Sequence, residues 1–279
     1  MTTGTTLVLG STGKTGRRVA QRLRARGLPV RPGSRAGAPP FDWQDQATWA
    51  PALRGVHAAY VSYYPDLAVP GAATTICSFA TLAVGLGIRR LVLLSGRGEE
   101  GAKHSEQAVQ ESGADWTILR SSWFSQNFSE DFLLESVRGG EVALPAGNMA
   151  EPFIDVEDIA DVAVAALTED GHAGCLYELT GPRLLTFAEA VAEIAAAAGR
   201  EVQYLPVSTE QYAAVLAAHG IPAEVTWLLT YLFTDVLDGR NAHLADGVRC
   251  ALGRQPRDFT DYARITAATG VWGEMEQGV

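Results

Sequence analysis

A short apolar run near the N-terminus gives way to glycines spaced three residues apart, and this feature constrains the fold most. Residues 5–9 form a strand-like run, and Gly10, Gly13 and Gly16 follow as a helical pattern begins. Gly10 would allow a sharp turn, Gly13 a close approach to a pyrophosphate, and Gly16 close helix packing. The phosphates would lie at the helix N-terminus, where N–H groups and the helix dipole favour negative charge. The predicted cofactor-binding turn comprises Gly10, Ser11, Thr12, Gly13, Lys14, Thr15 and Gly16.

A P-loop is the main alternative, because residues 13–15 read Gly-Lys-Thr. That loop requires a glycine five residues before Gly13, and Val8 stands there instead. A kinase or ATPase is therefore disfavoured. A second alternative stays open, in which the glycines only form a tight connection between a strand and a helix.

Composition restricts the class of partner. The chain has 279 residues, 47% of them hydrophobic, which is enough for one α/β domain with a smaller appendage. Its net charge of −10 provides no basic field, so we expect a small-molecule substrate and no nucleic acid. No apolar run approaches the length that spans a membrane, so we expect no membrane partner. A homo-oligomer remains compatible with the sequence.

The cysteines give no sign of a disulfide framework or a metal site. Cys77, Cys175 and Cys250 are odd in number and far apart, and they form neither a CxxC motif nor a cluster with histidine. We therefore expect no metal ion and a reducing, cytoplasmic environment.

The chain alternates between strand-like and helical segments over its first half, which is typical of a doubly wound parallel α/β sheet. Strands are predicted at residues 5–9, 28–31, 58–62, 91–95 and 116–120, and helices at 13–26, 69–86 and 106–112. Residues 1–150 are therefore predicted to form the nucleotide-binding domain.

The second half loses this strict alternation. Helices are predicted at 128–137, 156–167, 186–198, 208–218, 223–237 and 258–269, strands at 141–144, 175–179 and 201–206, and a frayed tail at 274–279. Thr186 is the expected N-cap of its helix, with Glu189 three residues on. Residues 151–279 are predicted to form a smaller, mainly helical substrate region whose late strands return to the sheet.

The end of the second strand indicates which dinucleotide binds. An acid there would accept hydrogen bonds from the ribose of NAD, whereas arginine receives the additional phosphate of NADP. Arg31, Ser34 and Arg35 occupy this segment, and no acid is present. We therefore predict a 2′-phosphate clamp and NADP(H) as the cofactor. The alternative is that both arginines are solvated loop residues.

Aromatic residues follow the strand predicted at 58–62, at the sheet edge where open α/β folds bind ligands. Tyr63, Tyr64 and Pro65 are predicted to wall the cofactor, although aromatics at a strand end equally often only pack.

Candidate catalytic residues lie in the segment that follows the strand predicted at 91–95. Short-chain dehydrogenases place Tyr-x-x-x-Lys here, the lysine lowering the tyrosine pKa, and this chain lacks the motif. The nearest substitutes are Ser95, Lys103, His104 and Glu106. His104 alone has an ordinary pKa suited to proton transfer near neutrality, and its alternative is a surface histidine at a helix start.

Several motifs together resemble the NmrA-like group of atypical short-chain dehydrogenases/reductases. They cover residues 5 to about 200 and read GSTGKTG, VRPGSR, LVLLSG, SGADWTILRSSWFSQNF and PFIDVEDIADVAVAAL. The resemblance implies an NAD(P)H-binding Rossmann core and a smaller C-terminal substrate region. Members of the group include quinone and isoflavone-type reductases, festuclavine dehydrogenases and non-catalytic sensors of the NADP/NADPH ratio.

The resemblance also implies roles for individual residues. Isoflavone-type reductases keep a catalytic lysine near the start of the helix after the fifth strand, and registering on residues 113–117 puts His104 at that position, beside Lys103. The family lysine is therefore displaced or replaced here. The segment with Trp123, Phe124 and Asn127 would begin the substrate pocket, and Phe153 lies at a similar pocket-facing turn.

Two functions follow from these residues. The first is an NADPH-dependent reductase of a quinone, enone or iminium, with Trp123, Phe124, Tyr63 and Trp227 stacking the acceptor against the nicotinamide. The Ala-, Gly- and Arg-rich composition is associated with high-GC actinobacteria, which favours a tailoring step in secondary metabolism. The second function is a sensor that binds NADP(H) without turnover. The apolar segment 223–237 favours a buried lid over an exposed docking face, and thus the reductase.

Overall fold

The computed structural model describes residues 4–273, which fall into two compact units, each with its own apolar core. Unit 1 is formed by Met1–Ser121, Val156–Leu179 and Asp246–Gln255, and unit 2 by Ser122–Asp155, Thr180–Ala245 and Pro256–Val279.

Unit 1 is built on a six-stranded parallel sheet in the order β2-β1-β3-β4-β5-β8. The sequence alternates strand and helix here, and parallel neighbours require such crossovers. The doubly wound α/β fold predicted from the sequence is confirmed, including the late return of β8 to the sheet. The strands are β1 (Thr5–Leu9), β2 (Val30–Gly33), β3 (Val56–Val61), β4 (Arg90–Gly96), β5 (Asp115–Ser121) and β8 (Cys175–Leu179).

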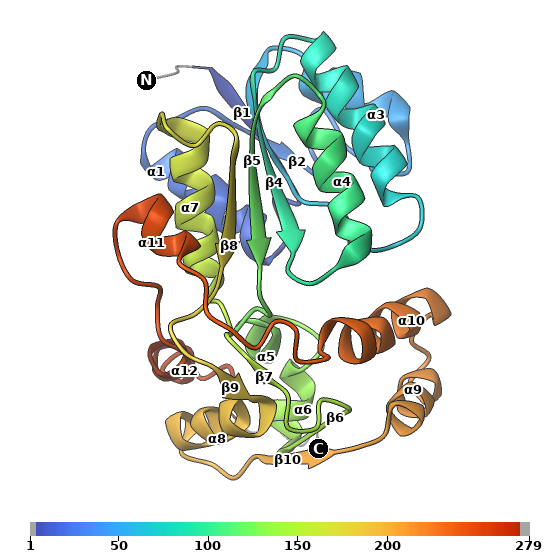
Figure 1. The fold of residues 1–279 in the computed structure, drawn as a ribbon, viewed down its shortest axis with the longest axis vertical. Coiled ribbons are helices and arrows are strands. Elements are labelled where there is room, and N and C mark those ends of the chain that lie inside the picture. Colours follow the sequence, from blue (N-terminus) through green and yellow to red (C-terminus); the bar gives the residue numbers. More distant parts are fainter. Residues whose placement is uncertain (1–3, 274–279) are drawn as a thin grey trace. The chain divides into compact units, whose positions relative to one another are not determined.

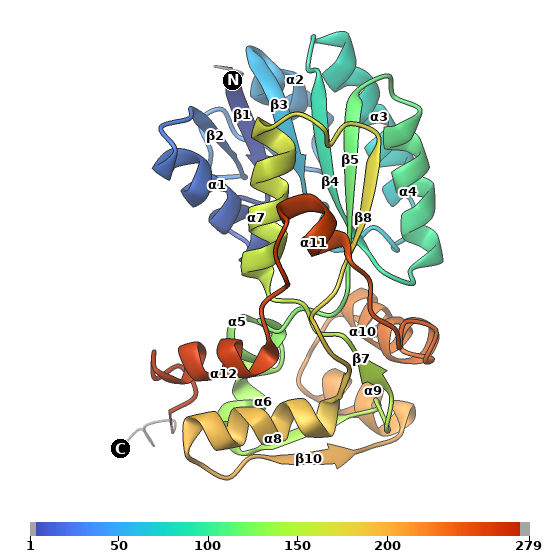
Figure 2. The ribbon, with the colours of Figure 1, turned by 60° about the vertical axis from the view of Figure 1, so that its left-hand side comes forward.

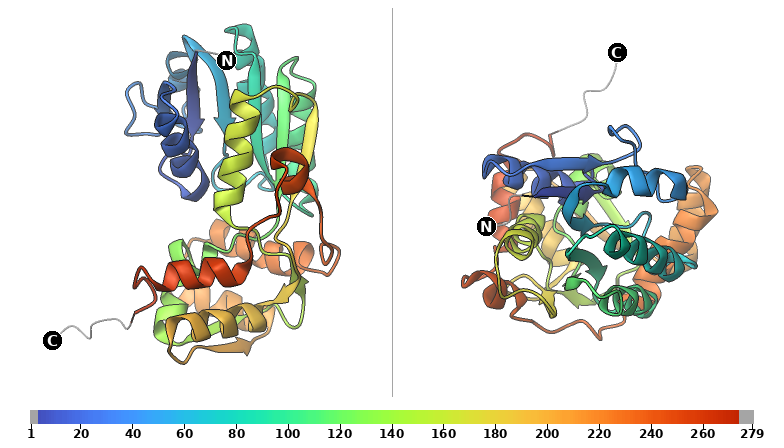
Figure 3. Two further views of the ribbon diagram at one scale, coloured as in Figure 1. Left: turned by 90° about the vertical axis from the view of Figure 1, so that its left-hand side faces the viewer. Right: turned by 90° about the horizontal axis from the view of Figure 1, so that it is seen from above.

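Helices cover both faces of this sheet (Figures 1 and 3). α1 (Lys14–Ala25) packs beside α7 (Val156–Thr168) on one face, and α3 (Ala72–Gly85) packs beside α4 (Glu100–Gln110) on the other. The short α2 (Trp49–Leu53) precedes β3, and α11 (Gly247–Leu252) packs against α7 and β8.

Charged side chains tie α1 to α7 across their solvent side. Arg22 Nε donates to Asp161 at 2.7 Å, and Arg18 Nε donates to Glu157 at 2.5 Å. Arg254, which follows α11, reaches Asp161 at 2.6 Å and the buried Asp158 at 2.7 Å. These partly buried networks fix the long-range return of α7 and α11 to unit 1, where isolated surface pairs would contribute little.

Unit 2 is mainly helical, with two small sheets (Figure 2). β10 (Gln203–Pro206) pairs in parallel with β6 (Glu141–Leu144), and β7 (Ala150–Glu151) pairs antiparallel with β9 (Leu185–Thr186). The core is aromatic, with Phe128, Phe153, Phe187, Phe259 and Trp272 all buried. The helices are α5 (Asn127–Glu130), α6 (Leu134–Gly139), α8 (Phe187–Ala198), α9 (Thr209–Ala218), α10 (Ala223–Tyr231) and α12 (Phe259–Ala267), and a π-helical turn at Leu232–Val236 continues α10.

The capping box predicted for α8 is present. Thr186 Oγ1 accepts from the Glu189 N–H at 3.1 Å, and the Glu189 carboxylate accepts from the Thr186 N–H at 2.7 Å. The reciprocal bonds satisfy two N–H groups that a helix start leaves without partners.

Three elements differ from the sequence prediction. α4 begins at Glu100, six residues before the predicted start, because the polar segment 100–106 is helix-compatible and Glu99 ends the loop in an extended conformation. The helix predicted at 128–137 is broken into α5 and α6, since Asp131 between them is extended. β10 pairs with β6 in unit 2, so of the late strands predicted to return, β8 joins the main sheet and β10 does not.

The division of the chain also differs from the single boundary placed near residue 150. Residues 122–150 lie in unit 2, whereas 156–179 and 246–255 return to unit 1. A strand and two helices far along the chain complete the sheet and its covering layer, a long-range arrangement that local pattern does not encode. The tail predicted at 274–279 lies outside the described residues.

Gly16 provides a test of how closely α1 packs on β1. A Cβ there would lie 2.2 Å from the Gly10 carbonyl oxygen and 3.0 Å from that of Leu9, both backbone atoms. We expect Gly16→Val to lower the free energy of unfolding by about 3 kcal/mol, because only backbone movement relieves the overlap. Gly85→Ala is the control, since Gly85 is helical and a Cβ there meets no atom within 4 Å. Urea unfolding of both variants measures the difference, and equal stabilities would contradict the packing.

Candidate functional site

The glycine-rich turn of unit 1 presents the start of α1 at the carboxyl end of β1. Gly10 has a φ of +63°, and the Gly13 N–H donates to the Gly10 carbonyl at 2.8 Å. Among the described residues, no side chain caps α1, and its first turn contains no acid. A helix start of this kind suits an anionic ligand. The residues present therefore fit a dinucleotide pyrophosphate.

The structure separates the roles of the two arginines after β2. Arg31 Nη1 donates to the carbonyls of Ala52 at 2.8 Å and Arg54 at 2.6 Å, so this side chain holds the end of α2. Arg35 is exposed and has no hydrogen bond or ion pair within residues 4–273. The Ser34 carbonyl accepts from Gly37 and Phe41, each at 2.9 Å, which shapes the loop. Arg35 is thus the cation with its full donor set available.

The aromatic residues after β3 differ in exposure. Tyr63 is half-buried and its ring lies 5.0 Å from that of Trp43, whereas Tyr64 is 77% exposed and Pro65 is also exposed. Trp43 Nε1 donates to the Ser62 carbonyl at 3.2 Å, which fixes the indole beside the end of β3. The sequence analysis did not assign Trp43 a role, although its position in the Gly/Pro-rich loop after β2 was the available signal.

Ser95 belongs to a buried ion network at the carboxyl ends of three neighbouring strands. The Ser95 hydroxyl donates to Glu106 Oε1 at 2.6 Å, and Arg120 Nε donates to the same oxygen at 3.0 Å. Arg120 Nη1 also reaches Glu178 on β8 at 3.3 Å, and Arg97 Nε reaches Glu178 at 3.2 Å. The hydrogen bonds that Arg120 donates to Glu106 raise the pKa of Arg120. Ser95 is thus engaged as a donor to a carboxylate, and sequence reasoning missed Arg97 and Glu178.

Lys103 and His104 lie on the exposed side of α4. Its buried face comprises Ala102, Ser105, Glu106 and Val109. Lys103 Nζ pairs with Glu100 at 2.6 Å. His104 makes no hydrogen bond or ion pair within the described chain. The structure therefore shows no interaction that joins Ser95 to either of the other two predicted catalytic residues.

Two further carboxyl groups meet at this edge of unit 1. Asp66 follows β3, Glu99 directly precedes α4, and each carboxyl is near enough to shift the pKa of the other. Burial raises the pKa of Glu99 well above its usual value, and the neighbouring Asp66 and Glu106 carboxylates raise it further. Burial also raises the pKa of Asp66, while the Ala68 N–H acts in the opposite direction. The sequence analysis missed this pair, because the two acids are 33 positions apart in polar segments.

The predicted substrate-binding aromatics of unit 2 lie in different environments. Trp123 is half-buried, with ring centroids 5.3 Å from Phe187 and 4.9 Å from Phe233. Phe153 is 3% exposed and packs in the aromatic core against Phe187. Phe153 is therefore a core residue of the unit.

The neighbouring predicted residues are partly accessible. Phe124 pairs through a backbone bridge with Ile154, and Asn127 begins α5; both are of intermediate exposure. Trp227 on α10 is 46% exposed and stacks on Tyr231 with a centroid distance of 5.6 Å and an interplanar angle of 9°. Leu228 and Leu229 are buried, so the segment predicted as a buried lid has an exposed aromatic side as well.

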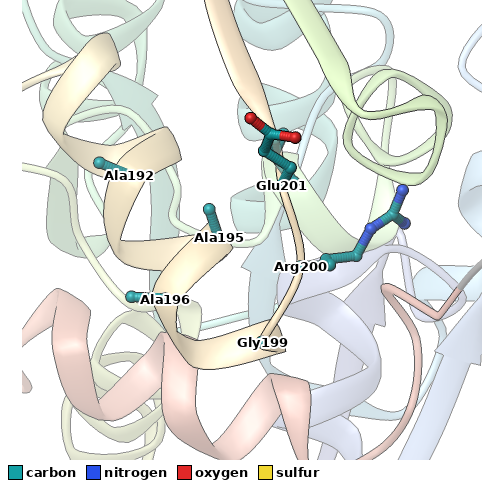
Figure 4. Close-up of a pocket in the computed structure, with 7 residues that line it drawn as sticks. Ala192, Ala195, Ala196, Gly199, Arg200 and Glu201 are labelled. Carbon is teal, nitrogen blue, oxygen red and sulfur yellow. The ribbon is translucent and has the colours of Figure 1, made fainter.

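An open hollow on α8 of unit 2 contains none of the predicted site residues. Figure 4 shows Ala192, Ala195 and Ala196 on one side of it and Arg200 and Glu201 on the other. Its lining offers few functional groups for recognition.

The arrangement of side chains and helices in residues 4–273 bears on metal binding and on membrane insertion. No group of three or more His, Cys, Asp or Glu side chains in this range is arranged to hold a metal ion. None of its helices combines the length and apolar character needed to cross a bilayer.

Comparisons with known proteins agree with this fold and turn. A family model described as NAD(P)H-binding matches residues 10–170. The uncharacterized oxidoreductase YesF of Bacillus subtilis (strain 168) is 33% identical over 96% of this chain and 98% of its own length. Agroclavine dehydrogenase of Claviceps fusiformis is 30% identical over the same shares of the two chains.

Solved structures share the fold at low sequence identity. Triphenylmethane reductase of Citrobacter sp., complexed with NADP(H), superposes with a TM-score of 0.74 at 19% identity, covering 95% of this chain and 99% of its own. An NADPH-dependent quinone oxidoreductase of Escherichia coli gives 0.74 at 22% identity, covering 93% and 98%. The negative transcriptional regulator NmrA gives 0.69 at 18% identity, covering 96% and 98%.

The family match covers more than half of the chain, and the relatives align over nearly their whole length. The predicted α/β fold and NAD(P)H cofactor class are thereby confirmed. The chain belongs to the NAD(P)H-binding family and is an NAD(P)H-dependent oxidoreductase of that family.

Proposed function

We propose that the protein is an NADPH-dependent reductase that transfers hydride to a small cyclic or aromatic unsaturated acceptor, such as a quinone, an enone or an iminium. The observation that carries the proposal is the glycine turn before the uncapped start of α1, beside a free Arg35. The cofactor would supply the hydride, held by its pyrophosphate at α1 and by its 2′-phosphate at Arg35. Ser34 and Arg31 shape the loop that presents Arg35.

The choice of acceptor rests on the absence of the Tyr-x-x-x-Lys pair, whose tyrosine protonates a carbonyl oxygen in short-chain dehydrogenases. The chain has no Tyr-x-x-x-Lys after β4, and Ser95 already donates to Glu106. A simple ketone needs a strong proton donor, whereas a quinone or iminium accepts hydride because it is electrophilic itself. The agroclavine dehydrogenase, triphenylmethane reductase and quinone oxidoreductase named above support acceptors of this kind. Trp123, Phe124, Asn127 and Trp227 would contact the acceptor, and a place in secondary metabolism is part of the proposal.

A sensor that binds NADP(H) without turnover is the second candidate. The exposed Trp227 stacks on the half-buried Tyr231 on α10, and this aromatic surface suits a protein-binding face as well as a substrate face. The structural likeness to NmrA gives a precedent for regulation on this fold. Both candidates require cofactor binding, and turnover separates them.

Cofactor preference tests the role of Arg35. We expect NADPH to bind at least about tenfold more tightly than NADH, which corresponds to about 1.4 kcal/mol of charge-assisted bonding to the 2′-phosphate. Arg35→Ala should remove most of this preference, whereas Arg24→Ala, an exposed change on α1 away from the loop, should keep it. Fluorescence titration with both cofactors measures the ratio. Equal affinities in the unchanged protein would remove the phosphate role from Arg35.

Gly13 separates binding from folding at the same turn. A Cβ at Gly13 would lie 3.3 Å from the Gly10 carbonyl oxygen, a much smaller conflict than at Gly16. We therefore expect Gly13→Val to remain folded and to lose NADPH binding, because its side chain would occupy the pyrophosphate position. Circular dichroism and calorimetric titration give the two readouts. Normal NADPH binding by the folded variant would show that the turn is only structural.

Turnover tests the reductase directly, together with the prediction that His104 is a proton donor. NADPH oxidation should occur with quinones, enones or imines. If His104 is the general acid that its sequence position suggests, His104→Ala should lower kcat by about 10²-fold with cofactor affinity nearly unchanged, and if another group donates the proton, His104→Ala should keep its kcat. Stopped-flow absorbance at the reduced-nicotinamide band measures both. NADPH binding without any turnover would favour the sensor, and a fully active His104→Ala variant would remove that role from His104.

A further inference from the structure

The half-buried Asp66 and the buried Glu99 of unit 1 form a carboxyl pair that joins two segments bordering the predicted cofactor edge. Asp66 follows β3, and Glu99 lies between β4 and α4. The backbones there approach closely, since a Cβ at Gly101 would lie 3.0 Å from Ala68 Cα. Asp66 Oδ1 accepts from the Ala68 N–H at 2.7 Å, and its carboxyl meets that of Glu99. Close backbone packing therefore brings two acids from different segments near each other.

The Glu99 carboxyl lies over the end of β4, one residue beyond Ser95. A Cβ at Gly96 would come 1.9 Å from Glu99 Oε1 and 2.5 Å from Oε2, so the position needs glycine to leave room for this carboxyl. Glu99 is 8% exposed, and its Oε2 has no hydrogen-bond partner in the described part of the chain. The carboxyl ends of parallel strands are where open α/β sheets bind ligands. A buried polar atom without a partner at this edge points to a group that arrives with the ligands.

The surroundings of the pair favour one bound proton. The charged groups that face Glu99 are Asp66 from the turn after β3 and Glu106 from α4, both acidic. The cations nearby are engaged, with Arg120 on Glu106 and Glu178, the buried Arg97 on Glu178, and Lys103 on Glu100. On α3, which packs against α4, the one titratable side chain is the exposed Cys77.

Two carboxylates in contact do not both ionise readily when they are buried. The Ala68 N–H already donates to Asp66, whereas Glu99 Oε2 has no partner in the described part of the chain, so Oε2 is the oxygen placed to carry a proton toward a bound ligand. A structural contact alone would not require an acid at position 99, because a neutral amide would occupy the same place without the desolvation cost. The pair is thus suited to holding a transferable proton.

We propose that the Glu99 carboxyl is the proton donor of the reaction and that Asp66 keeps it protonated, an inference that rests on the proposed reductase function. Hydride from NADPH would bring two electrons to a quinone, whose oxygen then takes the proton from Glu99 as the O–H bond of Glu99 breaks. The products are the hydroquinone, NADP⁺ and an ionised Glu99, which recovers its proton from solvent. In this proposal Glu99 is the proton donor, the role for which the sequence suggested His104, Ser95 or Lys103.

Comparing kcat for two hydride acceptors distinguishes proton donation by Glu99 from any other role of this residue. A benzoquinone needs hydride and a proton, whereas a triarylmethane cation needs hydride alone. We expect Glu99→Gln, which keeps size and one hydrogen-bond donor, to lower kcat with the quinone by about 10²-fold and to leave kcat with the cation within about twofold. Glu111→Gln, at the exposed end of α4, is the matched control and should leave both rates unchanged.

Asp66→Asn is the second variant, and it keeps the test open if Glu99→Gln does not fold. Without the Asp66 charge the proton on Glu99 is held less strongly, so the quinone rate should begin to fall at a lower pH, and the cation rate should not follow it. Equal losses with both acceptors would assign the pair a structural role, and unchanged quinone rates and pH profiles would show that Glu99 is not the donor. If the unchanged protein oxidises NADPH with neither acceptor, the reductase function itself fails and this inference with it.

Discussion

The carbonyl oxygen of Gly10 determines where α1 can lie, and the ligand-binding edge of unit 1 depends on that placement. It accepts the Gly13 N–H at 2.8 Å, which closes the turn, and it leaves room for no side chain at position 16. α1 consequently packs directly on β1, with its first N–H groups facing the edge at which the parallel strands end. The hydrogen bond from Gly13 to Gly10 and the absence of a side chain at Gly16 therefore allow this strand-to-helix connection to form an anion-binding site.

Many helices and strands of both units could be predicted because the relevant signals are local. β1 was predicted to the residue, and α1, α3, β6, α7, β8 and α8 lie within three residues of their predicted ends. Local pattern failed where distant segments decide the outcome. β10 reads as a strand from its own sequence, yet its pairing with β6 depends on how unit 2 closes. The return of 246–255 to unit 1 depends on Arg254 meeting Asp158 and Asp161, a contact between residues more than 90 positions apart.

The candidate site shows the same limit at the level of single side chains. Sequence reasoning placed the strand ends within two residues and therefore named Ser95, Arg35 and Tyr63 as candidates, but it could not show what each side chain contacts. Ser95 donates a hydrogen bond to Glu106, and Arg31 donates to the carbonyls at the end of α2. Phe153 packs in the aromatic core. Glu99 looked like an ordinary acid in a polar loop, because its burial depends on Gly96 and on Asp66 from another crossover. Burial and partnership are tertiary properties, so residue type alone did not rank these candidates.

The arrangement of charge in unit 1 bears on the choice between reductase and sensor. Cofactor binding requires positive potential at α1 and at the loop after β2, and both functions would use it equally. A sensor has no use for a buried acid pair, since two carboxyls taken from water destabilise the fold unless a proton is retained. Glu106, a third acid beside the pair, is balanced by Arg120, whereas the charged groups that raise the pKa of Glu99 are both acidic. Retaining that proton at the edge where β4 ends is costly for a protein that only binds, and it is useful to one whose product must gain a hydrogen on oxygen.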